Sequence, residues 1–552
     1  MEDKRQRLRQ HALASAVAAL CAGLCAGAAA FEINTGNDDV EMRWDNTVRY
    51  NLGRRVQSQD PAILRNIGAD DGDRNFGNNS IVNNRVDLLS EFDVVYRKQI
   101  GARVSAAGWY DDAYAGGFDN TSLATSNHLD NGRPAFGISD YAKRYYRGPS
   151  GEILDAFVFG NFNLGDAPTS VRAGQHTVNW GEALLGGGAI HGVTYAQAPL
   201  DQAKAFASPG IEAKELYRPL NQLSGTLQAT PELSFAAQYF LDWQATRAPE
   251  GGTYLGFNDA LQFGGESLFL APGVRALRGP DIRPKDSGDW GLASRWSPQW
   301  LDGTAGLYVR NFSDRLPQVI VKTTGVRQYF LAYGGDVDLY GVSLAKQIAG
   351  ISFGFDLNYR RNMPLVSDAV SVTSVAALPK PGDLLGARGN TSHGVLNALG
   401  SLGSTPLFNS ATWAAELTWN RWNSVTQGAA YFKGRDNYTA IDKVSRDYFG
   451  LAFNFSPTWY QVFPGGDLSM PMSYSRGLSG NSAVTFGGNE GAGSWSAGFA
   501  LDLYSKYRFE LKYVGYFGDY VTGPTGAVTV ANGSTALLKD RGAVFFTFKT
   551  TL

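Results

Sequence analysis

The chain has 552 residues, with 49 basic and 51 acidic side chains and a formal net charge of −2. This balance leaves no basic footprint for nucleic acid, so we expect no nucleic-acid partner. The two cysteines, Cys21 and Cys25, both lie close to the N-terminus. Structural disulfides, cysteine-ligated zinc and thiol chemistry are therefore excluded from the remainder of the chain.

Residues 1–30 have the pattern of a secretory signal peptide. Four basic residues precede an apolar run at about 12–29, and the run ends in the small residues that signal peptidase requires. We expect cleavage near Ala30. A membrane anchor is the alternative, but an alanine-rich stretch of about 18 residues ending in small residues favours a cleaved peptide. Residues 31–552 contain no segment apolar enough for a membrane helix, so any crossing must be made by strands.

Apolar and polar side chains alternate in many segments from residue 31 to the end, which predicts β-strands. The last segment, DRGAVFFTFKTTL, ends the chain inside this pattern, which is typical of barrel closure. No linker divides the chain. We predict an all-β fold: one large antiparallel transmembrane β-barrel over residues 31–552, with about 16–18 strands, an even number, and both termini periplasmic. The segments are 41–52, 86–97, 153–164, 233–244, 305–312, 337–346, 351–360, 411–420, 447–456, 494–503, 506–513 and 540–552.

The segment 506–513 separates charged from apolar side chains completely. A basic side chain facing lipid at the bilayer midplane costs roughly 2–4 kcal/mol, so the apolar face is expected against outer-membrane lipid and the charged face in the lumen. The mixed signs allow two roles: the charges line a solute path, or they pair with one another across strands. The expected lumen-lining charges are Arg43, Asp45, Arg49, Asp356, Arg360, Lys506, Arg508, Glu510 and Lys512.

Tight turns near 99–101 and 349–350 contrast with long connections at about 111–150, 245–287 and 362–410, which we expect to be extracellular loops. Two of the long connections are rich in apolar residues, at 261–277 and 371–386. Exposed apolar surface often marks a binding site. These segments either form a groove for a lipid-like ligand or pack on one another.

Residues 174–220 interrupt the alternation with a glycine triplet, three prolines and short helix-like fragments. We predict that this segment folds inward as a constriction or plug. The alternative is a loop at the rim that packs against its neighbours. The residues expected in the constriction are Trp180, Glu182, Glu212, Lys214 and Glu215.

Four blocks in this order, at 152–185, 208–220, 459–484 and 487–498, resemble a bacterial outer-membrane family, the domain of unknown function 1302. The resemblance covers nearly all of residues 31–552. It implies an outer-membrane β-barrel, often encoded beside an inner-membrane exporter of the resistance-nodulation-division type and a periplasmic companion, in settings of hydrophobic-compound metabolism. The family has no established catalytic residues, so none are carried over.

We predict no catalytic residues, no metal site and no cofactor. The histidines after residue 30, His128, His176, His191 and His393, match no metal-binding spacing, and no G-x-S-x-G motif is present. The acidic run from Asp70 to Asp73 could bind calcium but lacks the alternating ligand spacing of a dedicated loop, so a solvated turn is preferred.

The expected function is an outer-membrane channel or transport protein that passes or binds small hydrophobic or lipid-like molecules. An inner-membrane exporter and a periplasmic companion are its expected partners. One alternative is a water-filled porin for small polar solutes. Two others are an outer-membrane lipid or ester hydrolase with His176 as base, and a structural component that docks an exporter.

Overall fold

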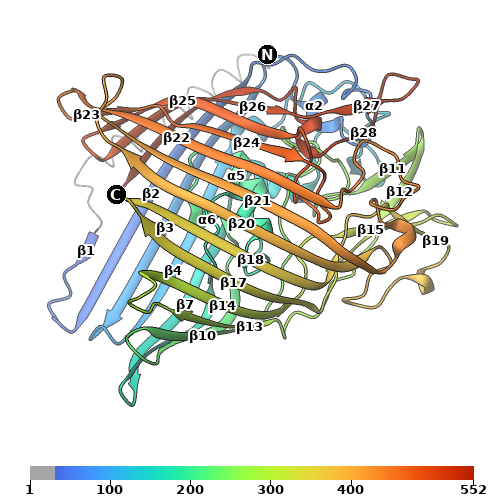
Figure 1. Cartoon of the computed structure of the whole chain (residues 1–552). Coiled ribbons are helices and arrows are strands. Elements are labelled where there is room, and N and C mark those ends of the chain that lie inside the picture. The colour runs from blue at the N-terminus through green and yellow to red at the C-terminus, as the bar shows by residue number, and fades with distance from the viewer. Residues whose placement is uncertain (1–30) are drawn as a thin grey trace.

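A computed structural model describes residues 31–552, which form a closed barrel of 18 antiparallel strands (Figure 1). The ring closes where the last strand pairs with the first long strand, from Thr47 opposite Thr551 to Arg55 opposite Ala543. The predicted fold class and the even strand number are confirmed. The expected signal peptide and its cleavage near Ala30 lie outside the described residues.

The barrel strands follow one another around the ring in chain order. They are β2 (Val40–Arg55), β3 (Ile81–Tyr96), β4 (Ile100–Asp111), β7 (Ser150–Leu164), β8 (Ala167–His176), β9 (Leu220–Gln228), β10 (Leu233–Phe240), β13 (Trp290–Trp296), β14 (Gly303–Phe312), β17 (Val337–Ile348), β18 (Ile351–Pro364), β20 (Arg388–Leu402), β21 (Ser410–Gln427), β22 (Asp447–Phe463), β24 (Met472–Ser479), β25 (Gly493–Leu503), β26 (Tyr507–Phe517) and β29 (Ala543–Thr551). Two short strands extend the wall: β1 (Phe31–Ile33) pairs with β2, and β23 (Gly466–Ser469) continues the line of β24 between β22 and β25.

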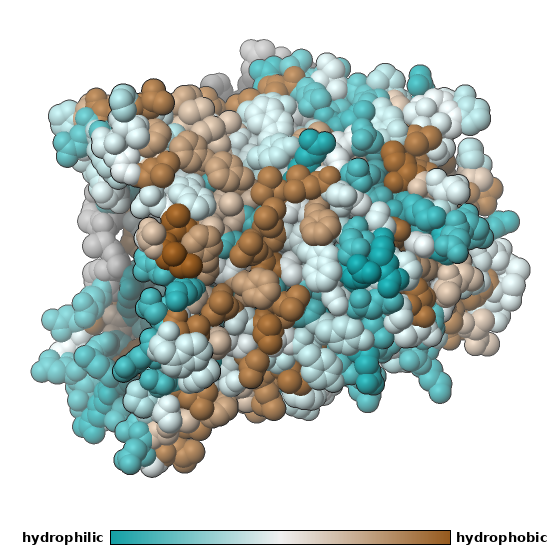
Figure 2. All heavy atoms as spheres, in the orientation of Figure 1, coloured by the Kyte–Doolittle hydropathy of each residue, from teal (hydrophilic) through white to brown (hydrophobic). Residues whose placement is uncertain are grey.

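Side chains alternate between the outer face and the lumen along each strand, as the pleat requires. Leu511 and Val158 on the outer face are more than half exposed, whereas the inward Arg49 and Asp356 are buried. Figure 2 shows apolar side chains gathered over the strand wall between more polar ends. An apolar exterior and a polar interior are the arrangement expected of a barrel in a lipid bilayer.

The two ends of the barrel differ in their connections. Short turns lie at the end that holds Phe31 and Leu552, for example at 97–99 and 349–350. The first lies two residues before the turn expected at 99–101, because Ile100 and Gly101 begin β4. Nine longer connections lie at the other end, at 56–80, 112–149, 177–219, 241–289, 313–336, 365–387, 428–446, 480–492 and 518–542.

The prediction of one long connection over 362–410 is wrong, because residues 388–402 form β20. The alternation is weak in this strand. The apolar Val395 points into the lumen opposite Thr418, while the outward positions include the small residues Ser392 and Gly394. A strand with an apolar inner residue and small outer residues does not produce the period-two pattern that identifies its neighbours.

The apolar loop segments pack on one another. For residues 261–277, this favours mutual packing over a groove for a lipid-like ligand. A five-stranded loop sheet consists of β11 (Ser267–Ala271), β12 (Val274–Arg278), β15 (Gln318–Lys322), β16 (Gln328–Ala332) and β19 (Val370–Val372). Its two faces bury separate apolar clusters, one around Trp243 and Tyr329 and the other around Ile320 and Phe330.

The remaining elements are short. They comprise the two-stranded ribbons β5 (Leu129–Asp130) with β6 (Arg133–Pro134) and β27 (Tyr520–Thr522) with β28 (Val528–Ala531), the helices α2 (Asp71–Asn75), α3 (Asp140–Ala142), α4 (Gly186–His191), α5 (Gln202–Ala207) and α6 (Ala213–Leu216), and the single turns η1 (Asp112–Tyr114), η2 (Lys143–Arg147), η3 (Val375–Ala377), η4 (Ala429–Tyr431) and η5 (Ser534–Leu537). Within residues 31–552, every helix is too short to span a bilayer.

The outer face can be tested at Leu511, which is 55% exposed in the middle of β26. We expect Leu511→Arg to destabilise the barrel by about 2–4 kcal/mol, because it places a cation in lipid near the midplane. The fraction of folded, heat-modifiable protein in outer-membrane extracts measures this. Tyr504→Arg is the matched control, because Tyr504 lies in the turn between β25 and β26. Equal yields of the two variants would contradict the assigned outer face.

Candidate functional site

The connection between β8 and β9, residues 177–219, lies inside the ring of strands and is called the plug below. Its helices α4, α5 and α6 are short, and α5 and α6 are seen within the barrel in Figure 1. The predicted segment, 174–220, is slightly wider because its first three residues complete β8 and its last begins β9. The contacts below show that the plug reaches opposite sides of the ring.

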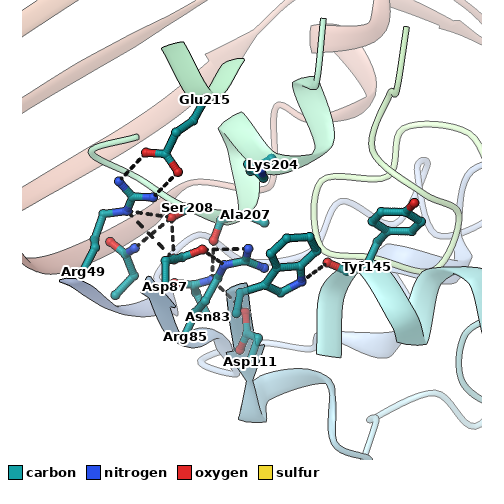
Figure 3. A network of polar contacts seen from close by, with 12 residues as sticks. Arg49, Asn83, Arg85, Asp87, Asp111, Tyr145, Lys204, Ala207, Ser208 and Glu215 are labelled. Carbon is teal, nitrogen blue, oxygen red and sulfur yellow. Dashed lines mark hydrogen bonds and ion pairs between the residues drawn. The ribbon is translucent and has the colours of Figure 1, made fainter. Parts of the chain in front are cut away.

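On one side, helix α6 is held to β2, β3 and β29 by ion pairs. The guanidinium of Arg49 donates to both carboxylate oxygens of Glu215, at 3.1 and 3.3 Å (Figure 3). Lys214 pairs with Glu91 of β3, and Glu212 pairs with Lys549 of β29. The three predicted charges at helix α6 therefore all contact the wall.

A second contact on this side comes from the end of helix α5. Ser208 accepts a hydrogen bond from Nε of Arg49 at 2.9 Å and donates one to Asp87 at 2.7 Å, as Figure 3 shows. Asp87 also pairs with Arg85 at 2.8 Å. Because Arg49, Asp87 and Glu215 are almost fully buried, each charge relies on these partners in place of water.

On the opposite side, two wall carboxylates accept hydrogen bonds from plug backbone. Glu416 of β21 accepts the N–H groups of Leu184, Leu185 and Gly188 at 2.7–2.9 Å. Asp356 of β18 accepts those of Glu182 and Val193 at 2.9 and 3.0 Å. The N–H groups at the start of a helix have no partner within the helix, so Glu416 supplies acceptors that α4 lacks.

Two arginines complete this second anchor by donating to plug carbonyl groups. Arg360 donates to the carbonyl oxygens of Ile190 and Gly192 at 2.8 and 3.1 Å. Arg310 donates to those of Val193 and Tyr195 at 2.8 and 2.6 Å. The sequence identified Arg360 as a lumen charge but missed Arg310 and Glu416. The only signal for Glu416 was a single acidic residue in the apolar segment 411–420.

The first predicted plug residues lie against a third part of the wall. Trp180 is half-buried, with its ring 6.1 Å from that of Tyr308 on β14. Glu182 lies 3.4 Å from Arg295 of β13, and burial raises the pKa of its carboxyl group above the ordinary value. Both side chains are at the start of the plug, as expected.

The remaining predicted lumen charges mostly pair locally. Arg43 lies 2.6 Å from Asp45, and Lys512 lies 2.6 Å from Glu510. Arg508 contacts Asp502 of the neighbouring strand β25 at 2.6 Å. The first two pairs lie within one strand and the third joins adjacent strands, so none of them crosses the lumen. Lys506 differs from its predicted position, because the left-handed backbone of the two residues before it makes the turn into β26, and Lys506 lies in this turn.

A buried histidine pair joins the plug to β20. Nδ1 of His191 lies 3.0 Å from Nδ1 of His393, and Nε2 of His191 lies 2.8 Å from the carbonyl oxygen of Gly487. Burial lowers the pKa of His191 to about 4, so this imidazole is neutral at pH 7. A neutral His191 donates from Nε2 to Gly487 and accepts at Nδ1 from His393. No spacing rule could have paired residues so far apart in the sequence.

A cavity of about 530 Å³ lies between the plug and the wall formed by β21 to β26. Aromatic and apolar side chains from the plug, the extracellular loops and the wall surround it, while the wall strands contribute several small residues that leave it open. The large lining side chains are Phe206, Phe257, Leu261, Tyr448, Phe486, Tyr516 and Leu537, and the small wall residues include Gly450, Ala452, Ser475, Gly477 and Ser494. A second cavity, of about 940 Å³, lies at Glu182–Leu184 and the turn ends of β13 to β20.

The family model described as "Protein of unknown function (DUF1302)" matches residues 11–552. The chain belongs to this family. No curated protein sequence matches it.

Several solved structures are similar over nearly their whole length. OccAB1 of Acinetobacter baumannii is 9% identical, with 95% of this chain and 99% of that chain covered and a TM-score of 0.44. OpdK of Pseudomonas aeruginosa, solved with vanillate, is 10% identical, with 93% and 98% covered and a TM-score of 0.39. A BenF-like porin from Pseudomonas fluorescens Pf-5 is 9% identical, with 93% and 99% covered and a TM-score of 0.40. These scores are low, so the architecture rests on the strand pairing described above.

The carboxylate anchor of the plug can be tested with Glu416→Gln. The amide keeps one acceptor oxygen, but its NH₂ group faces backbone N–H donors, and each charge-assisted bond lost costs about 1.5–3 kcal/mol. We expect the variant to show more frequent or larger openings in planar bilayers. Asp166→Asn, an exposed residue in the turn between β7 and β8, is the control. Conductance identical to wild type in Glu416→Gln would show that this anchor does not hold the plug.

The neutral His191 makes the docking of the plug depend on pH. The pKa of docked His191 is about 4, below the ordinary histidine value of about 6.5. Between these pH values, the imidazole is neutral in the docked state and binds a proton when the plug is released. The docked state is therefore most stable above pH 6.5 and weakens as the pH falls toward 4. We expect bilayer conductance to rise over this range.

The variants for this pH test are His191→Asn and His128→Gln. His191→Asn removes the titrating ring and should flatten the conductance profile between pH 6.5 and 4. His128→Gln alters a loop histidine that contacts Glu266 and should behave as wild type. A steep profile that persists in His191→Asn would assign the pH dependence to other groups.

Proposed function

We propose that this chain is an outer-membrane channel or transport protein that passes or binds small hydrophobic molecules. The solute occupies the cavity between the plug and the wall from β21 to β26. The observation that carries this proposal is the lining of that cavity, where five aromatic side chains and two leucines from the plug, the loops and the wall face one space.

The size and lining of the cavity suit a small apolar solute. Its volume of about 530 Å³ falls in the range of roughly 300–1,000 Å³ that is usual for small-molecule sites, which are mostly apolar with a few polar groups. Its lining also includes polar residues, among them Glu416, Gln202, Asn258, Arg476 and Asn489, and several serines and threonines. Since Glu416 is occupied by plug N–H groups, it does not present a free charge to the solute.

The charges elsewhere in the lumen support the same assignment. Most inward charges are neutralised by partners, as in Arg49 with Glu215 and Lys512 with Glu510. A strongly ion-selective pore would present an excess of one sign along its path. Paired charges keep the lumen hydrated and give little preference for an anion or a cation.

The chain presents no energy source of its own, so directed transport would need partners. The family resemblance suggests an inner-membrane exporter and a periplasmic companion. We propose that such partners act at the short-turn end, where Phe31 and Leu552 lie. Co-purification of an exporter component with this chain tests this part of the proposal.

The experiment measures entry of the hydrophobic fluorophore 1-N-phenylnaphthylamine into cells that carry the barrel in a porin-poor outer membrane. We expect Phe206→Ser and Phe257→Ser each to slow fluorophore entry by up to about tenfold, because each removes an apolar contact worth roughly 1–3 kcal/mol. Phe136→Ser is the matched control, since Phe136 is an exposed loop residue outside the cavity.

Planar-bilayer conductance separates this proposal from the general porin. A hydrophobic path beside a docked plug should give small currents, whereas a water-filled porin should give large open currents and fast entry of small sugars. Large currents in wild type, with fluorophore entry unchanged by Phe206→Ser and Phe257→Ser, would favour the porin.

A further inference from the structure

Three buried carboxyl groups from two extracellular connections meet above the barrel. Asp70 and Asp71 belong to residues 56–80, and Asp259 belongs to residues 241–289. One carboxylate oxygen of each lies within 4.8 Å of one from each of the others. Their exposures are 0, 3 and 4%. The sequence pattern favoured a solvated turn at Asp70–Asp73, but these groups are shielded from water and gain Asp259 from a distant loop.

Each of the three carboxylates uses one oxygen and leaves the other without a partner. Oδ2 of Asp71 accepts the N–H of Asn127 at 2.7 Å, Oδ2 of Asp259 accepts the N–H of Asp71 at 3.2 Å, and Oδ2 of Asp70 contacts Arg74. Within residues 31–552, Oδ1 of all three has no hydrogen-bond partner. Buried charged oxygens are normally paired or bound to a metal, so three unpartnered carboxylate oxygens in one place are suited to hold a cation.

The surrounding charges indicate which kind of ligand fits the three-carboxylate cluster. A neighbouring network is balanced, since Arg55 and Arg541 contact Asp73 at 2.6 and 3.1 Å and also contact Asp540. Its two cations therefore offset its two anions.

Among residues 31–552, Arg74 offsets Asp70, whereas Asp71 and Asp259 have no ion-pair partner. Arg275 donates to the carbonyl oxygens of Ala124 and Ser126 and to the hydroxyl of Ser267. Two uncompensated negative charges match one divalent cation.

We propose that Asp70, Asp71 and Asp259 bind one divalent cation, Ca²⁺ from the external medium, which ties residues 56–80 to residues 241–289. Ca²⁺ takes oxygen ligands in flexible geometry, and carboxylates from separate loops meet this requirement. The backbone N–H of Asn127 bonds Asp71, and the side-chain Oδ1 of Asn127 is also buried without a partner among the described residues.

The position of Asp259 links this cation to the cavity, on the condition that the proposed function holds. Asp259 lies between Phe257 and Leu261, which both line the cavity. The N–H of Asp259 also bonds the carbonyl oxygen of Gly68, so the two loops already touch at this point. The cation would hold the extracellular side of the cavity in place.

The test uses the full barrel purified in detergent, stripped of metal by a chelator and titrated with CaCl₂ by calorimetry, with MgCl₂ in a parallel titration. We expect one Ca²⁺ per chain, bound more tightly than Mg²⁺, and protection of residues 56–80 and 241–289 from protease when Ca²⁺ is present. The variant Asp71→Asn/Asp259→Asn should bind Ca²⁺ at least tenfold more weakly. Asp130→Asn, an exposed residue in the connection 112–149, should bind like wild type.

The unfolding temperature of the double variant separates loss of the Ca²⁺ site from misfolding. Because it removes the repulsion within the cluster, it should unfold at the same temperature as chelated wild type or at a higher one, and it should no longer respond to Ca²⁺. The proposal is overturned if wild type binds no Ca²⁺, if Mg²⁺ binds as tightly, or if the double variant binds Ca²⁺ like wild type. Ca²⁺ binding without any effect on fluorophore entry would keep the cation site and remove only its link to the cavity.

Discussion

The pairing of β29 with β2 is the constraint on which the other features depend. In hydrocarbon every backbone N–H and C=O group needs a partner within the protein, and only a closed sheet of strands can supply them all. Once the ring closes, with pairs from Thr47–Thr551 to Arg55–Ala543, every side chain of a barrel strand faces either the lipid or the lumen. Arg49 and Lys549 then lie opposite one another on adjacent strands, both directed inward. A ring of 18 strands is too wide for its own side chains to fill, so a further segment of chain occupies the lumen.

The plug is positioned by buried polar contacts more than by apolar packing. An ion pair such as Arg49 with Glu215 adds little net stability, because desolvation of both charges offsets their attraction. Leaving one partner buried alone is costly, however, and this penalty applies to every alternative position of the plug. Ion pairs on the side of β2 and backbone contacts to Asp356 and Glu416 on the other side therefore select one docked arrangement.

Features that depend on a local sequence pattern could be predicted, whereas features that depend on contacts between distant residues could not. Period-two alternation predicted the barrel, its outer face and the inward direction of residues such as Arg49 and Asp356. The break in alternation located the plug and its charges at Glu212–Glu215. The strand 388–402 escaped notice because its inner face carries apolar Val395 and its outer face carries small residues. Asp259 could not be associated with Asp70, since nothing in either segment encodes which loops meet above the barrel.

The anchors of the plug also determine where a solute can pass. The plug forms hydrogen bonds or ion pairs with strands β2, β3, β7 and β29 and with β10, β13, β14, β18, β20 and β21. Across residues 31–552, none of its hydrogen bonds or ion pairs reaches strands β22 to β26. Along those strands the wall turns small residues inward, including Gly450, Ala452 and Gly477, and the 530 Å³ cavity lies there. Under the proposed function, a solute on this side would separate no bond between the plug and strands β22 to β26. Opening the lumen elsewhere would require breaking buried charge pairs.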